Sequence, residues 1–341
     1  MLFSLAAACA VGDDLFPRRP ALVTAEAEKT IAKGLRRLDD LQNPDGSYGT
    51  GMYPCTMTSV AGLAFMAGGN TLHEGRYTSR VRRAVTYVLS CASPNGLIAR
   101  LGEEGSRPMY AHGYAMLFLA QAYGTAPDTE TQRAIRQVLD RAIRLTASAQ
   151  SRDGGWNYTP DSGGDEGSVT ITQVQGLRAA RNAGIRVPVS TIRRARKYIE
   201  NSANEDGGIA YRVRARGGSR PPITAAAVAV LYNAGEYDHP VALKAVKYLQ
   251  NYLGESQRRG RGILGHGHDA YFLMYISQAM FLHGEETWQS FFPDVRNSLI
   301  KHQAEDGGWT GHLRQGGEAF SVASALLTLQ MPYGYLPILQ R

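Results

Sequence analysis

An adjacent acidic pair, Asp165 and Glu166, stands in the segment GGDEGSVT and is a candidate for acid–base chemistry. A carboxyl group acts as a catalytic acid when burial and its neighbours raise its pKa toward the working pH. The same two residues stand directly before an apolar segment, where a helix favours an acidic cap or first turn. Capping is therefore the competing interpretation of both carboxylates.

Thiol, imidazole and carboxyl groups recur just before or at the start of the other apolar segments. Such groups, gathered on one rim, can bind a metal ion or transfer protons. No H-x3-H or HExxH spacing is present, so we expect neither a metal nor another cofactor. Loop, capping or filling roles compete with chemistry at each position. These residues are Cys55, His112, the turn Arg220-Pro221-Pro222, His266, His268, Asp269 and Glu318.

A repeated phrase indicates the elements that position these residues. The segments QNPDGSYG from Gln42, QSRDGGWNY from Gln150 and QAEDGGWTG from Gln303 are near copies of one another. Internal repetition with a period of 50 to 58 residues is typical of stacked helical hairpins and toroids. The glycine of the phrase recurs at positions 46, 96, 154, 207 and 307, and the last gap covers two periods.

Each period contains two kinds of helical segment. Outer segments are amphipathic, with an apolar stripe beside charged residues. Inner segments are apolar or small almost all round, which predicts burial. The outer segments cover 25–42, 76–90, 130–150, 189–202, 239–253 and 291–303, and the inner ones begin near 58, 112, 170, 223, 268 and 320.

Six such hairpins predict an all-α protein in the form of a closed α/α toroid, with the inner helices as a barrel and the outer helices as its sleeve. An open solenoid is the alternative, but it normally needs polar capping repeats that this sequence does not show. Alternating hairpins place the N-termini of all inner helices at one end of the barrel, where the helix dipoles are positive. We therefore expect Cys55, His112, Asp165, Glu166, His268 and Asp269 on one rim, with Asp165 or Glu166 facing the mouth.

The chain is expected to divide into a toroid at 25–335, an N-terminal segment at 1–24 and a C-terminal tail at 336–341. The first residues, MLFSLAAACAVGDD, are similar to the end of a signal peptide but lack its basic part. A periplasmic or secreted location, with this segment as a signal-peptide remnant, and a cytoplasmic location both stay open.

The distribution of charged and apolar residues argues against a nucleic-acid partner and against a membrane span. The net charge is +7, but the basic residues are spread along several helical segments and no nucleic-acid motif is present. No segment of the body of the chain reaches the ~18 apolar residues of a membrane span. We therefore expect no nucleic-acid partner and no transmembrane span, while peripheral membrane contact stays open.

The repeated phrase resembles the QW repeat of squalene and oxidosqualene cyclases, K-G-x3-L-x3-Q-x3-G-x-aromatic. Gln150 with Trp156, and Gln303 with Trp309, match its second half. The resemblance covers about 25–335 and implies the toroid of terpenoid cyclases, protein prenyltransferase β subunits and complement thioester domains. It is greatest to single-toroid bacterial proteins with prenyltransferase and squalene oxidase repeats, whose activity is generally unassigned. The full pattern is met by Lys33, Gly34, Leu38, Gln42, Gly46 and Tyr48.

The glutamines and aromatics of these repeats have a structural interpretation. A glutamine near the C-terminal end of an outer helix can bond the backbone of a neighbouring helix end, while the aromatic side chain packs beside it and the glycine permits the turn.

The family comparison also bears on chemistry. Class II terpene cyclases protonate their polyene with an aspartate of a DxDD motif at an inner-helix start, where this sequence offers Asp165 and Glu166 as an incomplete match. Prenyltransferase β subunits hold zinc with a D-x-C pair and the histidine of a D-x-Y-H segment. Here Phe272 stands at that histidine position and no D-x-C occurs, so zinc-dependent thioether formation is not expected.

Aromatic residues of the inner segments and repeats offer a wall for an isoprenoid chain or another apolar small molecule. Their faces can also stabilise a carbocation. Packing of twelve helices is the competing interpretation. The residues are Phe65, Tyr114, Phe118, Trp156, Tyr271, Phe272 and Tyr275.

Two classes of function follow. The first is a terpene-cyclase-like or prenyltransferase-like enzyme that binds or converts an isoprenoid in its central cavity, with Asp165 or Glu166 as proton donor. The second is a non-catalytic toroid that binds a lipid, peptide or protein. A glycoside hydrolase is a distant third, because it needs paired carboxylates over a long aromatic cleft. Either use of an isoprenoid predicts an apolar cavity of several hundred Å³, within the ~300 to 1,000 Å³ of small-molecule sites.

Overall fold

The computed structural model describes residues 19–49, 51–214, 217–264, 268–309, 313 and 316–340. Within these residues the secondary structure consists of α-helices and two short 3-10 helices, with isolated bridges in place of strands. The all-α prediction is therefore confirmed. The helices are α1 (Ala25–Asp40), α2 (Pro54–Ala67), α3 (Thr78–Ser90), α4 (Pro108–Tyr123), α5 (Thr129–Ser148), α6 (Gly167–Asn182), α7 (Val189–Ser202), α8 (Pro221–Asn233), α9 (Pro240–Arg258), α10 (Asp269–His283), α11 (Glu285–Lys301), α12 (Glu318–Gln330), η1 (Met331–Tyr333) and η2 (Pro337–Leu339).

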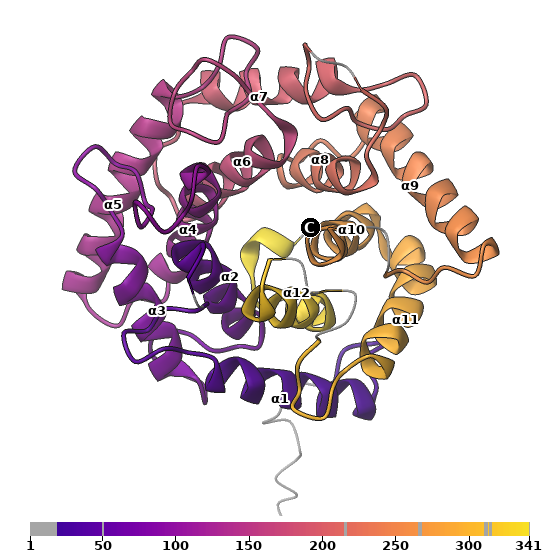
Figure 1. The fold of residues 1–341 in the computed structure, drawn as a ribbon, viewed down its shortest axis with the longest axis horizontal. Helices are drawn as coiled ribbons and strands as arrows, with labels where there is room; N and C mark the ends of the chain where they lie inside the picture. Colours follow the sequence, from indigo (N-terminus) through magenta and orange to yellow (C-terminus); the bar gives the residue numbers. More distant parts are fainter. Residues whose placement is uncertain are drawn as a thin grey trace, which may run out of the picture.

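The α-helices alternate between two concentric rings (Figure 1). The even-numbered helices α2 to α12 form the inner ring, and the odd-numbered helices α1 to α11 surround it. The ring is closed, because α12 packs against α2 as well as α10, and α1 packs against α12 and α11. The structure is thus the closed α/α toroid of six hairpins that the sequence predicts, and the open solenoid is excluded.

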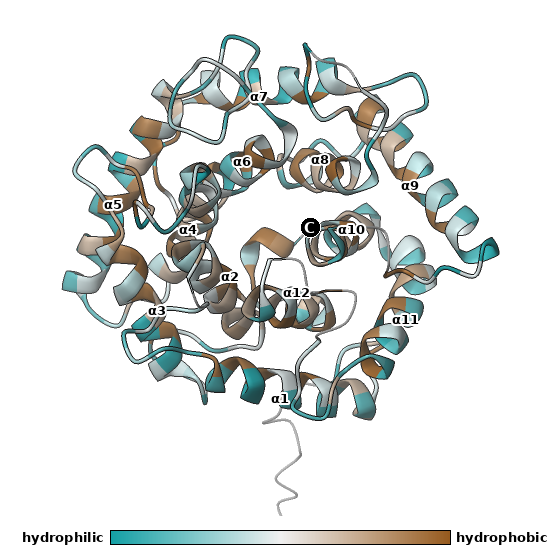
Figure 2. Cartoon of the chain, viewed as in Figure 1, coloured by the Kyte–Doolittle hydropathy of each residue, from teal (hydrophilic) through white to brown (hydrophobic). Residues whose placement is uncertain are grey.

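The hydropathy of the inner helices differs from that of the outer helices, which mix hydrophilic and hydrophobic residues (Figure 2), and burial follows the same division. Every residue of α2 is buried, which explains why its sequence has no polar face. Helix α5 instead buries one stripe that includes Ile135, Leu139 and Ala142, and turns its arginines outward. The prediction of buried inner helices and half-exposed outer helices is confirmed.

The repeated glutamine tethers neighbouring hairpins. Gln150 Nε2 donates to the carbonyl oxygens of Gly154 at 2.8 Å and of Thr191, at the start of α7, at 3.0 Å. Trp156 Nε1 donates to the Thr146 carbonyl at 2.7 Å and its ring is fully buried. These bonds confirm the structural interpretation of the repeat. Gln42 bonds Gly46 and Arg80 in the same way, and Gln303 bonds Gly307 and Thr30.

The glycine of the repeat is required by its backbone conformation and by a close approach. Gly154 has φ +98°, and a Cβ atom there would lie 2.3 Å from the carbonyl oxygen of Arg194 on the next outer helix. An L-residue would therefore suffer both a strained backbone and a steric clash. The glycines at 46, 96, 207 and 307 share this arrangement, each against the backbone oxygen of the following outer helix in the ring.

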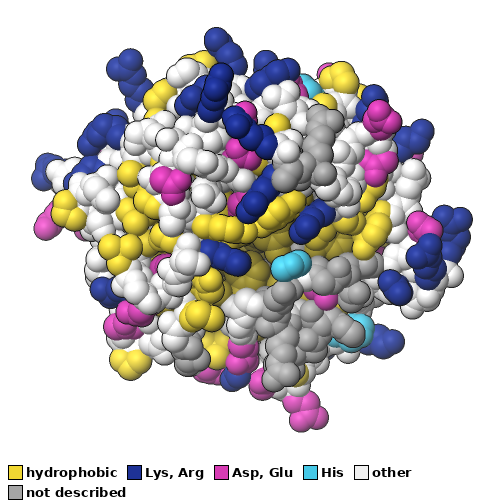
Figure 3. Space-filling model, turned by 45° about the horizontal axis from the view of Figure 1, so that its top comes forward, with side chains coloured by type: hydrophobic (Ala, Val, Ile, Leu, Met, Phe, Trp, Pro, Cys, Tyr) yellow, Lys and Arg dark blue, Asp and Glu magenta, His cyan; other side chains and the backbone are white. Residues whose placement is uncertain are grey.

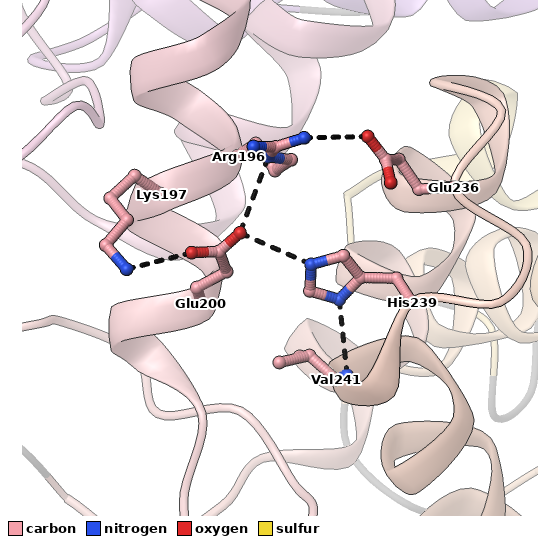
Figure 4. Close-up of polar contacts among 6 residues, drawn as sticks. All are labelled: Arg196, Lys197, Glu200, Glu236, His239 and Val241. Atoms are coloured by element: carbon pink, nitrogen blue, oxygen red, sulfur yellow. Dashed lines mark hydrogen bonds and ion pairs between the residues drawn. The ribbon is translucent and has the colours of Figure 1, made fainter.

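Charged contacts also join adjacent hairpins on the sleeve (Figure 4). Glu200 on α7 bonds Lys197 at 3.0 Å and lies 3.3 Å from His239 Nε2, while Arg196 reaches Glu236 at 2.9 Å. Burial raises the pKa of Glu200, but the bonds from Lys197 and His239 outweigh it and hold the pKa below its ordinary value. The cluster links α7 to the segment that starts α9, where His239 caps the Val241 amide.

The C-terminal segment covers the end of the barrel opposite the inner-helix N-termini. Tyr335 lies against Gly69, just beyond the C-terminal end of α2, and Gln330 donates to the Ala64 carbonyl at 2.9 Å. Helix η2 packs on α6, with Ile338 and Leu339 buried. The C-terminal segment therefore packs against this end of the inner ring in the described part of the chain.

Candidate functional site

A cavity of about 560 Å³ occupies the end of the barrel at which the inner helices begin. Residues from all six inner helices line it, and Figure 3 shows it as a yellow hollow on this face. The volume lies within the ~300 to 1,000 Å³ of small-molecule sites, as predicted. The lining residues are Tyr53, Thr56, Met57, Arg107, Tyr110, Tyr114, Ser168, Tyr211, Ser219, Arg220, Pro221, Pro222, Ile223, His268, Tyr271, Gly316 and Phe320.

Prolines fix where three of the inner helices start, and so place the residues of the mouth. Helices α2, α4 and α8 begin at Pro54, Pro108 and Pro221, two to four residues before the predicted starts. Proline suits the first helical position because its missing N–H would have no partner there. The residues directly before them are Tyr53, Arg107 and Arg220, and all three line the cavity.

Hydroxyl groups form one wall of the cavity. The Tyr110 hydroxyl bonds the Ser168 hydroxyl, which also lies 3.5 Å from the Tyr211 hydroxyl. Tyr211 in turn bonds the hydroxyl of Tyr158 at 2.6 Å. The loops before α6 and α8 therefore meet at the mouth through these side chains. Of these four hydroxyl residues, only Ser168 belongs to a segment, GGDEGSVT, in which the sequence predicted a candidate catalytic group.

Glu166 lies directly behind this wall. Its side chain is fully buried and caps α6, accepting from the Val169 amide at 2.6 Å and the Ser168 amide at 3.2 Å. The Ser168 hydroxyl also donates to it, at 2.7 Å. Burial raises the pKa of Glu166 above its ordinary value, while the bonds from Tyr211, Ser168 and the amides oppose that rise. The carboxyl group does not itself line the cavity, but Ser168 connects it to the cavity.

Asp165 does not line the cavity. It is half-buried and accepts from the Ser151 hydroxyl at 3.3 Å, on the side of the repeat that contains Gly155. Burial raises the pKa of Asp165 as well. The acidic pair is therefore split, and only Glu166 is connected to the cavity through a hydrogen bond.

A polar chain runs inward from the cavity floor. Tyr114 lines the cavity and its hydroxyl lies 3.5 Å from that of Tyr275, which donates to Gln175 at 3.2 Å. Gln175 then donates to Gln278 at 2.6 Å. The neighbouring Tyr271 also lines the cavity, and its buried hydroxyl has no hydrogen-bond partner among the described residues. Tyr271 is thus a donor that a ligand oxygen can accept from.

The remaining predicted wall residues serve packing in this structure. Phe65 packs on Tyr77 with ring centroids 5.1 Å apart, and Phe272 packs edge-on against Tyr252 at 6.2 Å. A Cβ atom at Gly62 would lie 2.3 Å from the ring of Phe118, so that ring fills the space beside α2. Of the seven aromatic candidates, Tyr114 and Tyr271 line the cavity, whereas Phe65, Phe118, Trp156, Phe272 and Tyr275 do not.

Of the four polar rim candidates, His268 lines the cavity, whereas Cys55, His112 and Asp269 do not. Asp269 is buried in the first turn of α10, beside His268. His112 is fully buried, with Nδ1 accepting from the Ile98 amide at 3.1 Å and Nε2 2.9 Å from the Thr146 hydroxyl. Cys55 is buried, and its amide donates to Glu104 at 2.8 Å.

Among the described residues no group of three or more His, Cys, Asp or Glu side chains could hold a metal ion. Within the same residues, no helix is both long enough and apolar enough to span a bilayer. His266 lies outside the described residues.

Two arginines, Arg107 and Arg220, stand at the mouth of the cavity. The guanidinium of Arg107 lies 4.7 Å from the ring centroid of Tyr158, and that of Arg220 lies 4.7 Å from that of Tyr211. In the described part of the chain, neither forms an ion pair with an acidic side chain. Arg107 was missed from the sequence, where its only signal is its position directly before Pro108.

The α/α toroid with a central cavity is shared with solved structures of several activities. The α-1,6-mannanase GH76A of Salegentibacter sp. HEL1_6 is similar over 91% of this chain and 99% of its own, with a TM-score of 0.65 and 10% identity. The type II terpene cyclase MstE from Scytonema is similar over 92% of this chain and 100% of its own, with a TM-score of 0.59 and 14% identity. At these identities the likeness establishes the fold alone.

In sequence, the chain is similar to drimenyl diphosphate synthase from Streptomyces showdoensis, with 26% identity over 206 residues. The match covers 60% of this chain and 35% of that protein, so the chain corresponds to about a third of its curated relative. No family model matches the sequence. Together with the fold, this relative confirms the resemblance to the terpenoid cyclase superfamily.

Proposed function

We propose that the protein binds an acyclic isoprenoid chain in its central cavity and converts it by terpene-cyclase-like chemistry that begins with a proton. The observation that carries the proposal is the cavity, which all six inner helices surround and which Met57, Tyr114, Tyr271 and Phe320 line with apolar and aromatic surface. Such a surface favours a hydrocarbon chain, and aromatic faces stabilise the cations that form along it. The relative named for drimenyl diphosphate synthesis supports the same class of ligand.

Glu166 is the proposed proton donor. Its raised pKa keeps a larger fraction of the carboxyl protonated than in water, and the Ser168 hydroxyl lies between it and the cavity. When Glu166 is protonated, the direction of its bond to Ser168 reverses and the carboxylic O–H donates to the Ser168 oxygen. A carbon–carbon double bond beside Ser168 then takes the hydroxyl proton while Ser168 takes the proton of Glu166. The resulting carboxylate is held by the amides of Ser168 and Val169. The cation then loses a proton to solvent, and Glu166 takes up a proton from solvent through Ser168, so that protons balance over the cycle.

Turnover of linear isoprenoids by four proteins tests this role. Wild type, Glu166→Gln, Ser168→Ala and Asp165→Asn are each incubated with a panel of linear prenyl alcohols and prenyl diphosphates, and the extracts are analysed by gas chromatography and mass spectrometry. Glu166→Gln and Ser168→Ala should abolish or strongly reduce cyclic product, whereas Asp165→Asn should retain it because Asp165 does not reach the cavity.

A stability control separates chemistry from capping. Glu166→Gln weakens the cap of α6 and should cost ~0.5 to 2 kcal/mol of unfolding free energy. Urea unfolding therefore accompanies the assay, which is run where all four proteins are folded. Equal turnover by wild type and Glu166→Gln would contradict the proton-donor role.

Non-catalytic binding is the second candidate, and one observation favours it. None of the described lining residues is an aspartate or glutamate, so no carboxyl group touches the cavity directly. The same fact disfavours a glycoside hydrolase, which needs two carboxyl groups at the site. Binding of an isoprenoid without turnover of any member of the panel would establish the binding toroid in place of the enzyme.

A further inference from the structure

We propose that Cys55 and Cys91 form an oxidation site, at which a hydroperoxide converts the two thiols into a disulfide between the start of α2 and the end of α3. Cys91 is the thiol that attacks the peroxide, and Cys55 is the thiol that resolves the product. This inference does not depend on the proposed function, because neither cysteine lines the cavity.

The two thiols come together from separate helices. Cys55 is the second residue of α2, and Cys91 follows the last residue of α3. Both cysteines are free, and their side chains form a hydrogen bond with each other. A disulfide needs a sulfur–sulfur bond of about 2 Å and neighbouring Cβ atoms. Two thiols in contact already come close to this arrangement, so small side-chain movements can join them.

The backbone holds both cysteines side by side. The Cys55 amide donates to the buried Glu104 side chain at 2.8 Å, and the Cys55 carbonyl accepts from the Ser59 hydroxyl at 2.8 Å. The Cys91 carbonyl accepts from the Ala99 amide at 3.1 Å. Glu104 and Ala99 belong to the same stretch between α3 and α4, so this stretch fixes the position of both thiols.

The surroundings make the two thiols unequal. The hydrogen bond from Cys55 lowers the pKa of Cys91, burial opposes this and the Arg100 guanidinium supports it, so that the pKa lies below its ordinary value. The same hydrogen bond and burial raise the pKa of Cys55. The ring of Tyr87 holds Arg100 beside the pair, 5.3 Å from its centroid. Cys91 is also 4% exposed, against 0% for Cys55. Because the thiolate is the nucleophile, Cys91 reacts first.

The reaction balances with one molecule of hydroperoxide. The Cys91 thiolate attacks a peroxide oxygen, so that a sulfur–oxygen bond forms and the oxygen–oxygen bond breaks. The leaving oxygen takes up the proton that Cys91 had released. The Cys55 sulfur then attacks the sulfur of the resulting sulfenic acid, and the departing hydroxide takes the proton of Cys55 and leaves as water. Two electrons pass from the two thiols to the peroxide.

The disulfide would stabilise one sector of the cavity mouth. Thr56 and Met57 follow Cys55 and line the cavity, and the Thr56 hydroxyl donates to Glu104 at 3.0 Å. The cross-link closes the loop from residue 55 to residue 91 and so lowers the entropy of the unfolded chain. Oxidation should therefore raise the melting temperature, by about 3 to 5 °C for a chain of this length.

Thiol mapping after peroxide treatment tests the site. Cys9 lies outside the described residues, so the parent protein carries Cys9→Ser, and Cys55→Ser and Cys91→Ser are made in that background. The folded proteins are treated with hydrogen peroxide, unfolded with iodoacetamide and digested for mass spectrometry. The parent should yield a peptide pair that joins Cys55 to Cys91 within one molecule and that a reductant separates.

The single variants separate the roles of the two cysteines. In Cys55→Ser, Cys91 should stop at the sulfenic acid, which dimedone traps, because no second thiol resolves it. In Cys91→Ser, Cys55 should stay reduced. Arg100→Gln should slow the oxidation of Cys91 by ~3- to 10-fold, because it removes a positive charge that favours the thiolate. The matched control Arg76→Gln should oxidise at the rate of the parent, since Arg76 stacks on Tyr77 at 5.6 Å, just before α3 starts.

Two kinds of outcome would overturn the proposal. If the folded parent keeps both thiols under peroxide conditions that oxidise them in the unfolded protein, or if the disulfide joins two molecules, the pair is a packing contact alone. If Cys55 reacts as fast in Cys91→Ser as Cys91 does in Cys55→Ser, or if Arg100→Gln oxidises at the rate of Arg76→Gln, the assigned order is wrong. Circular dichroism shows that each variant is folded, and Cys55→Ala replaces Cys55→Ser where the latter unfolds.

Discussion

Acidification should weaken the fold through His112, a fully buried imidazole in α4. In the neutral ring, Nδ1 accepts from the Ile98 amide and Nε2 donates to the Thr146 hydroxyl, so both nitrogens are satisfied. A second proton would have to sit on Nδ1, facing the Ile98 amide, and would break that bond. Burial accordingly lowers the pKa of His112 from 6.5 to about 4.

The size and direction of the effect follow from this difference in pKa. Above pH 6.5 the ring is neutral in both the folded and the unfolded chain, and His112 adds nothing to the pH dependence. Between 6.5 and about 4 the unfolded chain binds a proton that the folded protein does not, so the free energy of unfolding falls as the pH falls. At about 1.4 kcal/mol per pH unit, the full loss is about 3 kcal/mol.

Urea unfolding at pH values of about 7, 5.5 and 4 measures this loss. The proteins are wild type, His112→Asn and His73→Asn, the last being an exposed histidine on the surface. Other titrating groups affect all three proteins alike, so the comparison isolates His112. Wild type and His73→Asn should lose ~3 kcal/mol more than His112→Asn on acidification. A parallel decline in all three proteins would refute the buried, neutral imidazole.

Three further changes test the repeat, the sleeve and the acid. Gln150→Ala removes a side chain with two bonds to backbone carbonyls and one from Arg194, and should lower the unfolding free energy by ~1 to 3 kcal/mol in urea, against ~0.5 kcal/mol or less for the exposed Gln257→Ala. Glu200→Gln should cost ~0.2 to 1 kcal/mol at pH 7, and the difference from wild type should vanish as the pH falls through the lowered pKa of Glu200. Any turnover should decline as the pH rises through the raised pKa of Glu166, which must be protonated to act; an activity that rises steadily with pH would contradict it.

The sequence predicted the toroid because the evidence for it is periodic. The glycine of the repeated phrase recurs in five of the six hairpins, at 46, 96, 154, 207 and 307, and apolar segments alternate with amphipathic ones, so the number, order and layering of the helices follow from this spacing. Helix boundaries were less exact. Helix α11 begins at Glu285, whereas the sequence predicted a start at 291. A proline usually marks the start of a helix, but Pro293 lies inside α11.

The cavity wall could be predicted only in part, because a helix buried on every side has no stripe that shows which residues face the cavity. Tyr114 and Phe118 lie on one face of α4, one turn apart, yet only Tyr114 lines the cavity, since Phe118 lies one turn deeper against Gly62. The lining residues of the inner helices fall within the first seven positions of each helix. The hydropathy of the sequence does not show how deep in the barrel a residue lies, so it could not predict this limit. Tyr211 was missed because loop contacts place it.

A crystal structure with bound farnesyl diphosphate tests the central claim most directly. The account predicts electron density for the prenyl chain inside the barrel, between Tyr114, Tyr271 and Phe320. An empty cavity at saturating ligand, or a ligand bound only on the outer sleeve, would contradict it.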